Sequence, residues 1–244
     1  MTIQLDGTVV TTTMRTPGHD FELAVGFCHT EGLLPDGVPV TGVRYCGTGS
    51  AVETAFNVVT VETGGVAPTP TPRLGTTSSS CGWCGSDHLD ELTARLTPFD
   101  EPDPIPFEVI RSVPAAVSQH QGLFDATGAV HAAAVFDRTG AIELVREDVG
   151  RHNAVDKVVG ALRLADGLPV EGRGMFVSGR ASIEMVQKAW AAGCSTLVAV
   201  SAPTALAVTA ARRANMTLVG FMRDECCNVY SPERLPEGSV PAPR

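Results

Sequence analysis

Two thiols three positions apart are the residues of this chain best suited to covalent chemistry. They lie in Cys81-Gly82-Trp83-Cys84-Gly85, which follows a polar run of threonine and serine. A thiolate is the reactive form of cysteine, and a second thiol nearby can lower the pKa of the first and accept or resolve a sulfur bound to it. The glycines keep both sulfur atoms approachable. The same spacing also serves redox dithiols and half of many zinc sites, so the pair predicts sulfur chemistry and leaves its kind open.

Two further polar segments are candidates for binding an anion such as phosphate. Ser178-Gly179-Arg180-Ala181-Ser182 falls at a predicted strand-to-helix turn and offers a hydroxyl, a guanidinium and an adaptable backbone. Asp148-Val149-Gly150-Arg151-His152-Asn153 precedes a predicted helix that also carries Lys157. Ligands of open α/β sheets collect at such strand ends. Arg151 and Lys157 could instead form surface ion pairs with Glu147 and Asp156, which are common and contribute little, and spacing alone does not decide.

The first half of the chain is expected to form a small α+β unit that positions the thiol pair. Asp6-Gly7 predicts a tight hairpin turn, because both residues tolerate positive φ angles. Residues 64–80 are rich in Pro, Gly, Ser and Thr, which favours a loop that carries the thiols outward. The predicted elements are a hairpin over Ile3–Arg15, a helix from Phe21 to Gly32, strands near Val40–Cys46 and Ala51–Glu62, and a helix from Ser86 through Leu96. The proline run Pro102–Pro106 marks the predicted domain boundary.

From Ser112 onward, strands and helices alternate, which is typical of an α/β fold. Ser112 with Pro114 is expected to start a helix, since proline is favoured in the first helical turn. The later strands are apolar and β-branched, which favours a buried parallel sheet within three layers. The predicted elements are an antiparallel pair over Val130–Asp137 and Ala141–Arg146, a helix over Asn153–Leu164, strands over Gly174–Val177, Thr196–Ser201 and Met216–Met222, and helices over Ser182–Ala192 and Pro203–Ala214.

Composition limits the classes of function. A chain of 244 residues with 43% hydrophobic content can bury the core of one large domain or two modest ones. Its 27 acidic and 18 basic residues give a net charge of −9, which provides no general attraction for nucleic acid or an anionic membrane. No apolar run reaches the ~20 residues of a membrane helix. Seven cysteines without a leader segment predict a soluble protein of the reduced cytoplasm, without disulfide scaffolding.

Six motifs follow one another along nearly the whole chain. They are Cys81-Gly82-Trp83-Cys84-Gly85, Gly122-Leu123-Phe124-Asp125-Ala126-Thr127-Gly128 leading into Val130-His131-Ala132-Ala133, Glu147 to Lys157, Ser178 to Ser182, Val200-Ser201-Ala202-Pro203, and Asn228-Val229-Tyr230. In this order they closely resemble the formate dehydrogenase accessory sulfurtransferase family. The resemblance implies that the protein takes persulfide sulfur from a cysteine desulfurase and passes it to the molybdenum cofactor of formate dehydrogenase, a bis-molybdopterin guanine dinucleotide.

The resemblance also implies a fold and an assembly. It predicts a cytidine deaminase-like three-layer α/β/α domain over residues 107–244, a smaller N-terminal α+β subdomain over residues 1–106, and a homodimer. Members of the family usually have an earlier N-terminal segment, so a truncated or incomplete sequence is expected.

Individual residues acquire roles by the same resemblance. Cys81 is the expected persulfide carrier, and Cys84 is expected to assist transfer or to resolve a disulfide. The segment Phe221-Met222-Arg223-Asp224-Glu225-Cys226 aligns with the family's segment that binds the guanine dinucleotide. Glu225-Cys226-Cys227 replaces the glycine-and-basic character that is usual there, so backbone contacts are expected more than side-chain contacts.

The remaining expected contacts concern the pyrophosphates and the guanine of the cofactor. These contacts are Arg151, Lys157, Ser178, Arg180 and backbone N–H groups. His131 and His152 are candidate proton carriers, although a buried and hydrogen-bonded histidine is the more frequent role for a residue such as His131. No permanently bound metal is expected.

Four alternatives remain. A zinc-dependent, deaminase-like hydrolase would need His-x-Glu before the cysteine pair, whereas here His131 follows the pair and Ala133 replaces the catalytic Glu. Structural zinc through the thiol pair and His88 lacks a local fourth ligand. A non-enzymatic carrier of the cofactor would not need the thiols, and a thioredoxin-type role lacks the usual strand-to-helix position. Apolar surroundings predict that three more cysteines fill the core: Cys28, Cys46 and Cys194.

Overall fold

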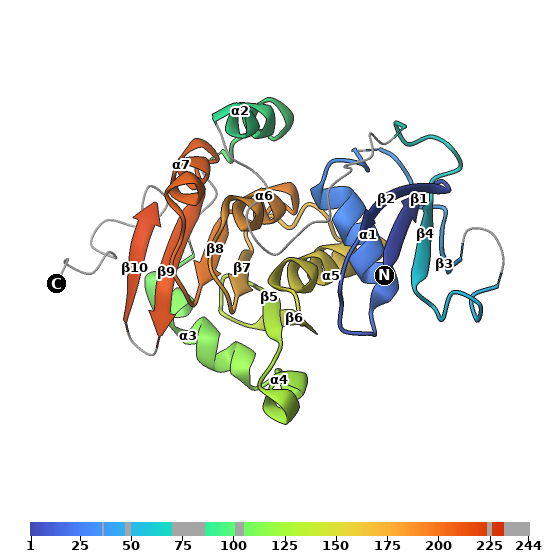
Figure 1. The fold of residues 1–244 in the computed structure, drawn as a ribbon. Coiled ribbons are helices and arrows are strands. Elements are labelled where there is room, and N and C mark those ends of the chain that lie inside the picture. The colour runs from blue at the N-terminus through green and yellow to red at the C-terminus, as the bar shows by residue number, and fades with distance from the viewer. Residues whose placement is uncertain (36, 47–49, 70–85, 101–104, 224–225, 232–244) are drawn as a thin grey trace.

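The computed structural model describes residues 1–244 except 36, 47–49, 70–85, 101–104, 224–225 and 232–244 (Figure 1). It contains two β-sheets, with helices between them and on both faces of the larger sheet. The mixed α/β class predicted from the sequence is therefore confirmed. Within the described residues, no helix combines the length and the apolar character needed to cross a membrane.

The smaller sheet has the strand order β2-β1-β4-β3. Its strands are β1 (Thr2–Leu5), β2 (Thr8–Thr12), β3 (Gly42–Tyr45) and β4 (Val58–Glu62). β1 and β2 form the predicted hairpin, in which Asp6 and Gly7 have φ angles of 46° and 84°. The strand predicted from Ala51 begins only at Val58, because residues 51–56 form turns that end with positive φ at Phe56.

Helix α1 joins the smaller sheet to the rest of the fold. α1 (Asp20–Thr30) packs Leu23 with Ile3 and Val59 of the sheet in one apolar core. On its other side it crosses α5 (Arg151–Leu164), and the two backbones touch. A Cβ atom at Gly26 or at Gly160 would collide with a backbone carbonyl of the other helix, so only glycine permits this approach.

The larger sheet has the strand order β10-β9-β8-β7-β5-β6. Its strands are β5 (His131–Phe136), β6 (Ile142–Asp148), β7 (Gly174–Val177), β8 (Thr196–Ala199), β9 (Thr217–Arg223) and β10 (Cys226–Ser231). β7, β8 and β9 are parallel and β5 and β6 are antiparallel, as predicted. β10 was not predicted, and it adds to the sheet antiparallel to β9.

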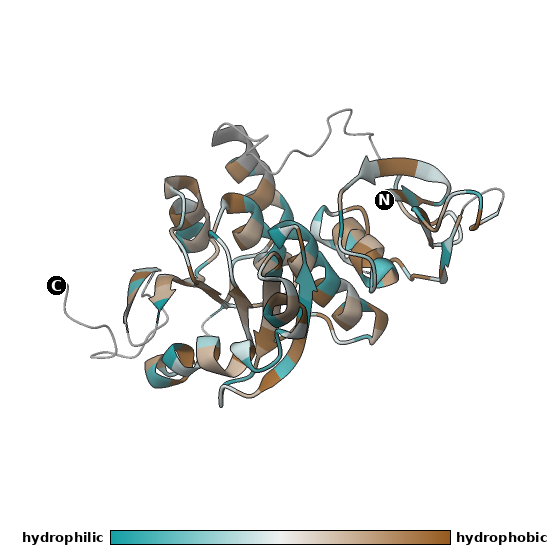
Figure 2. Cartoon of the chain, turned by 60° about the horizontal axis from the view of Figure 1, so that its bottom comes forward, coloured by the Kyte–Doolittle hydropathy of each residue, from teal (hydrophilic) through white to brown (hydrophobic). Residues whose placement is uncertain are grey.

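Helices cover both faces of this sheet, so the predicted three layers are present. The helices are α3 (Phe107–Ser118) on one face and α5, α6 (Ile183–Ala191) and α7 (Ala205–Arg213) on the other. Alternate strand residues point to opposite faces. In β7, Met175 and Val177 therefore pack with α5 to α7, whereas Phe176 packs with α3. Figure 2 shows apolar and polar residues alternating around the helices, as expected when each helix buries one face.

Helix α3 begins earlier than predicted. It starts at Phe107 rather than at Ser112, and Pro114 lies inside it. The buried residues Ile110, Val113 and Val117 recur at helical spacing, so packing against the sheet outweighs the hydrogen bond that proline cannot make. A short helix that was not predicted, α4 (Gly122–Thr127), follows and leads into β5.

Helix α2 lies before the predicted domain boundary yet packs with the C-terminal core. α2 (Ser86–Arg95) places Leu89 and Leu92 in the same core cluster as residues of α6 and α7. Beyond its end, the Phe99 N–H donates to the Ala214 carbonyl at 3.0 Å. The division into residues 1–106 and 107–244 stays a prediction, with α2 packed across it.

Candidate functional site

The predicted thiol pair, Cys81 and Cys84, lies outside the described residues, but the elements on either side are described. β4 ends at Glu62 in the smaller sheet, and α2 begins two residues after Cys84. The end of α2 is held against α6, because Trp190 Nε1 donates to the Thr97 carbonyl at 2.7 Å. The thiol-bearing segment therefore connects the smaller sheet to a helix that is packed on the larger sheet's helical layer.

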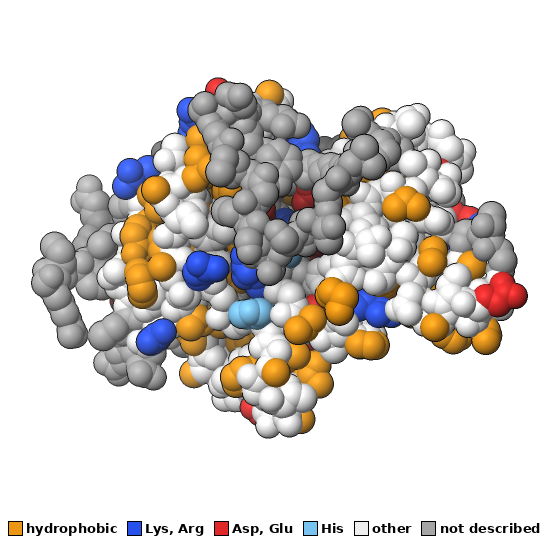
Figure 3. All heavy atoms as spheres, in the orientation of Figure 1, with side chains coloured by type: hydrophobic (Ala, Val, Ile, Leu, Met, Phe, Trp, Pro, Cys, Tyr) orange, Lys and Arg blue, Asp and Glu red, His pale blue; other side chains and the backbone are white. Residues whose placement is uncertain are grey.

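The carboxyl ends of the parallel strands β7, β8 and β9 form one edge, joined by backbone hydrogen bonds. The Ser201 N–H donates to the Gly179 carbonyl at 3.3 Å, and the Phe221 N–H donates to the Ser201 carbonyl at 3.2 Å. These bonds connect the turn at residues 178–180 with the end of β9. Figure 3 shows Lys and Arg side chains, with a histidine, gathered over this part of the molecule. The fold thus brings together two segments that were predicted separately as binding segments.

The segment predicted to bind the guanine dinucleotide is described in part. Phe221 is 43% exposed and has a φ of 52°, a conformation that costs free energy in a residue with a side chain and clusters at functional sites. Arg223 is exposed, whereas Met222 is buried in the core beneath α3 and can meet a ligand only through its backbone. Three parts of the segment lie outside the description: Asp224, Glu225 and the side chain of Cys226.

Ser178 and His131 meet where β5 and β7 pair. The Ala132 N–H donates to Ser178 Oγ at 2.9 Å, and His131 Nδ1 lies 3.2 Å from the same oxygen. A Cβ atom at Gly179 would lie 3.5 Å from His131 Cε1 and 3.2 Å from Arg151 Cδ, so this turn is packed between the two side chains. Burial, and then the Arg151 guanidinium, lower the pKa of His131. His131 is thus a half-buried, hydrogen-bonded and neutral histidine that lies beside the strand edge.

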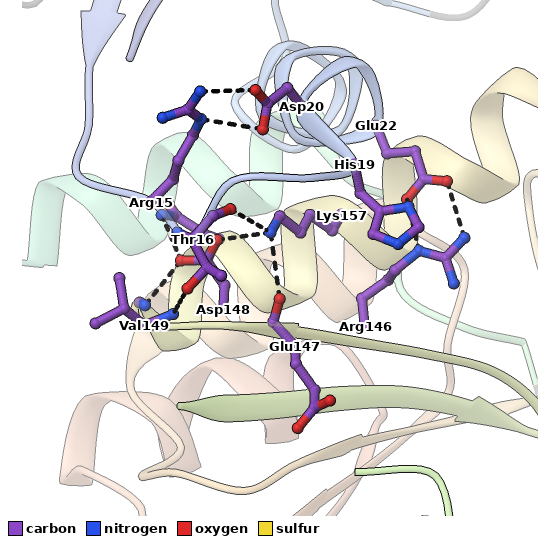
Figure 4. A network of polar contacts seen from close by, with 12 residues as sticks. Arg15, Thr16, His19, Asp20, Glu22, Arg146, Glu147, Asp148, Val149 and Lys157 are labelled. Atoms are coloured by element: carbon purple, nitrogen blue, oxygen red, sulfur yellow. Dashed lines mark hydrogen bonds and ion pairs between the residues drawn. The ribbon is translucent and has the colours of Figure 1, made fainter. Parts of the chain in front are cut away.

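Lys157, predicted as a cofactor contact, is a buried structural cation (Figure 4). Its Nζ lies 2.8 Å from Asp148 Oδ2 and donates to the carbonyls of Thr16 and Glu147 at 3.0 and 3.2 Å. The side chains of Lys157 and Asp148 are 1% and 0% exposed. The three ammonium hydrogens are used in these contacts, so a ligand could reach Lys157 only if the network broke. A surface ion pair, the other prediction for Lys157, is wrong for the same reason.

His152 is unsuited to carry protons near neutral pH. Burial lowers its pKa to about 4, and the positive charges of Lys188 and Arg151 add to the shift. The imidazole therefore stays neutral through the physiological range, and a proton-carrier role for His152 does not follow from this geometry.

Two polar side chains at the start of α6 were not assigned a role from sequence. Ser182 ends the motif that begins at Ser178, but its hydroxyl is buried and has no hydrogen-bond partner in the described part of the chain. In Glu184, one carboxylate oxygen is buried and also lacks a partner there. A serine before a helix with an acidic residue in its first turn normally indicates an ordinary N-terminal cap. The sequence pattern therefore does not show that Ser182 Oγ and Glu184 Oε2 are unpartnered.

The remaining predicted cysteines fill the core, as expected. Cys28, Cys46 and Cys194 are buried. Burial raises the pKa of Cys194 to about 12 and also raises that of Cys28, so neither is a nucleophile at neutral pH. Within the described part of the chain, no three His, Cys, Asp or Glu side chains gather as a metal site, and the zinc ligands considered at 81, 84 and 88 fall outside it.

A cavity of about 750 Å³ opens at the other end of the helical layer, away from the strand edge. Its walls include Arg163 near the end of α5 and Trp190 near the end of α6. None of the predicted site residues that the structure describes lines this cavity. The strand edge and the cavity are therefore separate features, at opposite ends of α6.

By its fold and its candidate site, the chain is a two-sheet α/β protein whose parallel strands end in an edge that carries arginines. A family model described as the FdhD/NarQ family matches residues 1–236. Several similar proteins carry the name sulfur carrier protein FdhD, among them the two that follow. That of Mycolicibacterium paratuberculosis is 43% identical over 235 residues, which cover 94% of this chain and 86% of the relative. That of Streptomyces avermitilis is 46% identical over 240 residues, which cover 95% and 84%. The chain belongs to the FdhD/NarQ family.

A solved structure shares the fold. A putative formate dehydrogenase accessory protein from Desulfotalea psychrophila superposes with a TM-score of 0.75, over 96% of this chain and 88% of that one. The two sequences are 24% identical, and at this level the likeness shows the fold alone.

Proposed function

We propose that this protein is a sulfur carrier required for formate dehydrogenase activity. It accepts persulfide sulfur from a cysteine desulfurase on Cys81 and delivers it to a molybdenum cofactor, a bis-molybdopterin guanine dinucleotide, which is its substrate. Membership of the FdhD/NarQ family and the name of the relatives support sulfur carriage. The observation that carries the cofactor part of the proposal is the edge at the carboxyl ends of β7, β8 and β9, where the turns after β7 and β8 are hydrogen-bonded to each other and to Phe221 near the end of β9.

Sulfur uptake and release balance with the two thiols. In uptake, the Cys81 thiolate attacks the outer sulfur of the donor persulfide, the donor S–S bond breaks, and the donor cysteine leaves as a thiolate. In release, the Cys84 thiolate attacks the inner sulfur on Cys81. A Cys81–Cys84 disulfide forms and the outer sulfur leaves as hydrosulfide, which becomes a ligand of the cofactor's metal. The two cysteines supply both electrons, and a cellular thiol reductant restores the dithiol.

The strand edge holds and orients the cofactor in this proposal. Arg180 and Arg223 are exposed there and provide charge for pyrophosphate oxygens, and the Arg151 side chain packs against Gly179 in the turn after β7. The N–H groups at the start of α6 add further donors for an anion. Phe221 offers an exposed aromatic face on which a planar ring can stack. Ser178 contributes by fixing the turn, and Lys157 acts only by holding the structure together.

The finer predictions on fold, assembly and location belong to the same proposal. Two buried cysteines that form no disulfide, Cys28 and Cys194, support a reduced cytoplasmic environment. The three-layer arrangement around parallel β7, β8 and β9 supports a cytidine deaminase-like C-terminal unit. We further propose a homodimer without a permanently bound metal.

The test starts from the purified protein incubated with a cysteine desulfurase and cysteine, followed by non-reducing intact-mass and peptide analysis. We expect one added sulfur atom on Cys81 or Cys84, which is lost when molybdenum cofactor is supplied. Cys81→Ser and Cys84→Ser assign the carrier and its partner. Absence of sulfur uptake together with retained affinity for guanine nucleotide would refute sulfur transfer and leave a cofactor carrier.

A further inference from the structure

The start of α6 holds two polar groups that the fold itself leaves unused. Ser182 precedes the helix, is 4% exposed, and its Oγ neither caps a backbone N–H nor has another hydrogen-bond partner among the residues that the structure describes. Two residues further on, Glu184 Oε2 is buried and likewise has no partner among them. A buried acceptor that lacks a donor is destabilising, and native proteins keep few of them. The pair therefore requires an explanation beyond folding.

Lys188, the residue of α6 best placed to pair with Glu184, is paired with other carboxylates. Lys188 lies four residues further along, which is the spacing of a helical ion pair. Its ammonium instead contacts both carboxylate oxygens of Asp156, at 2.8 and 3.0 Å, and Glu31 Oε1 at 3.2 Å. The negative charge of Glu184 favours a protonated His152, but burial lowers the pKa of His152 to about 4, so it stays neutral at pH 7. Among the described residues, no neighbouring cation satisfies the buried oxygen of Glu184.

These groups lie at the strand edge proposed above for the cofactor. Ser182 directly follows the turn of Arg180, and the Thr204 N–H donates to the Ala181 carbonyl at 3.0 Å, which ties this turn to the one after β8. Near the end of β9, the Phe221 N–H donates to the Ser201 carbonyl of the β8 turn at 3.2 Å. Adjacent strands are about 4.8 Å apart, so the edge from β7 to β9 measures about 10 Å. One nucleoside diphosphate can span that distance.

We propose that Glu184 reads the guanine base of the bound cofactor, with Ser182 as a second hydrogen-bonding group. The proposal rests on the function proposed above, which supplies a guanine-containing ligand. Guanine presents N1–H and N2–H₂ side by side, and these donors match the two oxygens of a carboxylate. Adenine presents an acceptor at N1, which a carboxylate repels. Phosphate is repelled as well, so the diphosphate extends away from Glu184 toward Arg180 and Arg223.

The test measures the affinity of the full chain for GDP, IDP and ADP by calorimetry. The wild type should bind GDP several-fold more tightly than IDP, which lacks the 2-amino group, and should bind ADP most weakly. Glu184→Gln should lose about tenfold to a hundredfold in GDP affinity, the range of charge-assisted hydrogen bonds, while ADP affinity stays or rises. Ser182→Ala should weaken GDP binding by a smaller factor. Glu143→Gln is the matched control, because Glu143 pairs with Arg173 on the surface and should bind as the wild type does.

The outcomes separate this inference from the proposed function. A wild type that binds none of the three nucleotides overturns the cofactor site and the inference together. A wild type that binds GDP and IDP equally overturns only the inference that Glu184 recognises guanine and leaves the cofactor site standing. This comparison needs only the wild-type protein. Equal losses of GDP and ADP affinity in a folded Glu184→Gln protein also overturn it, since they indicate a general positioning role. A collapse of the GDP-to-ADP preference in that variant supports it.

Discussion

Replacing Lys157 by methionine tests whether this cation is structural. The variant keeps an unbranched apolar chain and removes the ammonium, so Asp148 becomes a carboxylate that is 0% exposed and has lost its ion-pair partner. Removing one partner of a buried pair costs about 3–5 kcal/mol. Asp148 retains hydrogen bonds from the N–H groups of Thr16 and Gly150 and from Asn153, so we expect the lower end, about 3 kcal/mol. For a chain of this size, that loss corresponds to a melting temperature lower by about 6–12 °C.

Urea and thermal unfolding measure this loss, with GDP affinity as a second reading. Arg173→Met is the control, because the Arg173 and Glu143 side chains are 39% and 34% exposed and such a pair contributes at most about 1 kcal/mol. The double variant Lys157→Met with Asp148→Asn should recover part of the stability by removing the orphaned charge. A loss below about 1 kcal/mol in Lys157→Met, together with a large loss of GDP affinity, would refute the structural role and restore Lys157 as a ligand contact.

His152→Gln should change how stability depends on pH. The lowered pKa of His152 means that the unfolded state binds more protons between the ordinary value of 6.5 and about 4. Urea unfolding at several pH values should therefore show the stability of the wild type relative to the variant falling by roughly 2–3 kcal/mol on acidification through that window, and a constant difference would contradict the shift. Gly26→Ala should cost about 3 kcal/mol in chemical denaturation, because its methyl group meets an α5 carbonyl, whereas Gly122→Ala, with open space around it, should cost little. Cys28 and Cys194 should resist iodoacetamide in the native protein and react after unfolding, as peptide mass spectrometry would show; labelling of the native protein would disprove their burial.

Local patterns predicted those parts of the fold that local forces decide. The Asp6-Gly7 turn adopts the positive φ angles that such a pair favours, and the apolar runs at β7, β8 and β9 became parallel strands. The start of α3 was misplaced because Pro114 resembles a helix start, while the decisive contacts are those of Ile110 and Val113 with the sheet. Likewise, β10 forms by pairing with the edge of β9, and the sequence of β10 by itself does not predict that pairing.

The residue types at the candidate site were predictable from the sequence. Which of their side chains are exposed to a ligand was not. Lys157 and Arg180 both occur in polar motifs before or within the first turns of helices. The sequence could not show that the first is enclosed by Thr16, which is 141 positions away, and that the second is exposed. The same limit hid Ser182, since a capping serine and an unused serine look alike in sequence.

The placement of the cations explains how a protein of net charge −9 can present a site for an anion. Lys157, Lys188 and Arg146 are paired with carboxylates inside the fold, so they add little positive charge at the surface. Arg180 and Arg223 are exposed at the strand edge, where the helix start contributes N–H donors of the same sign. Because exposed charges act over about 10 Å, this local pair decides ligand attraction more than the distant acidic surface does. In the proposed complex, the carboxylate of Glu184 at the same edge limits which part of the ligand can lie beside it. The diphosphate would lie against the arginines, and a group rich in N–H donors would lie against Glu184.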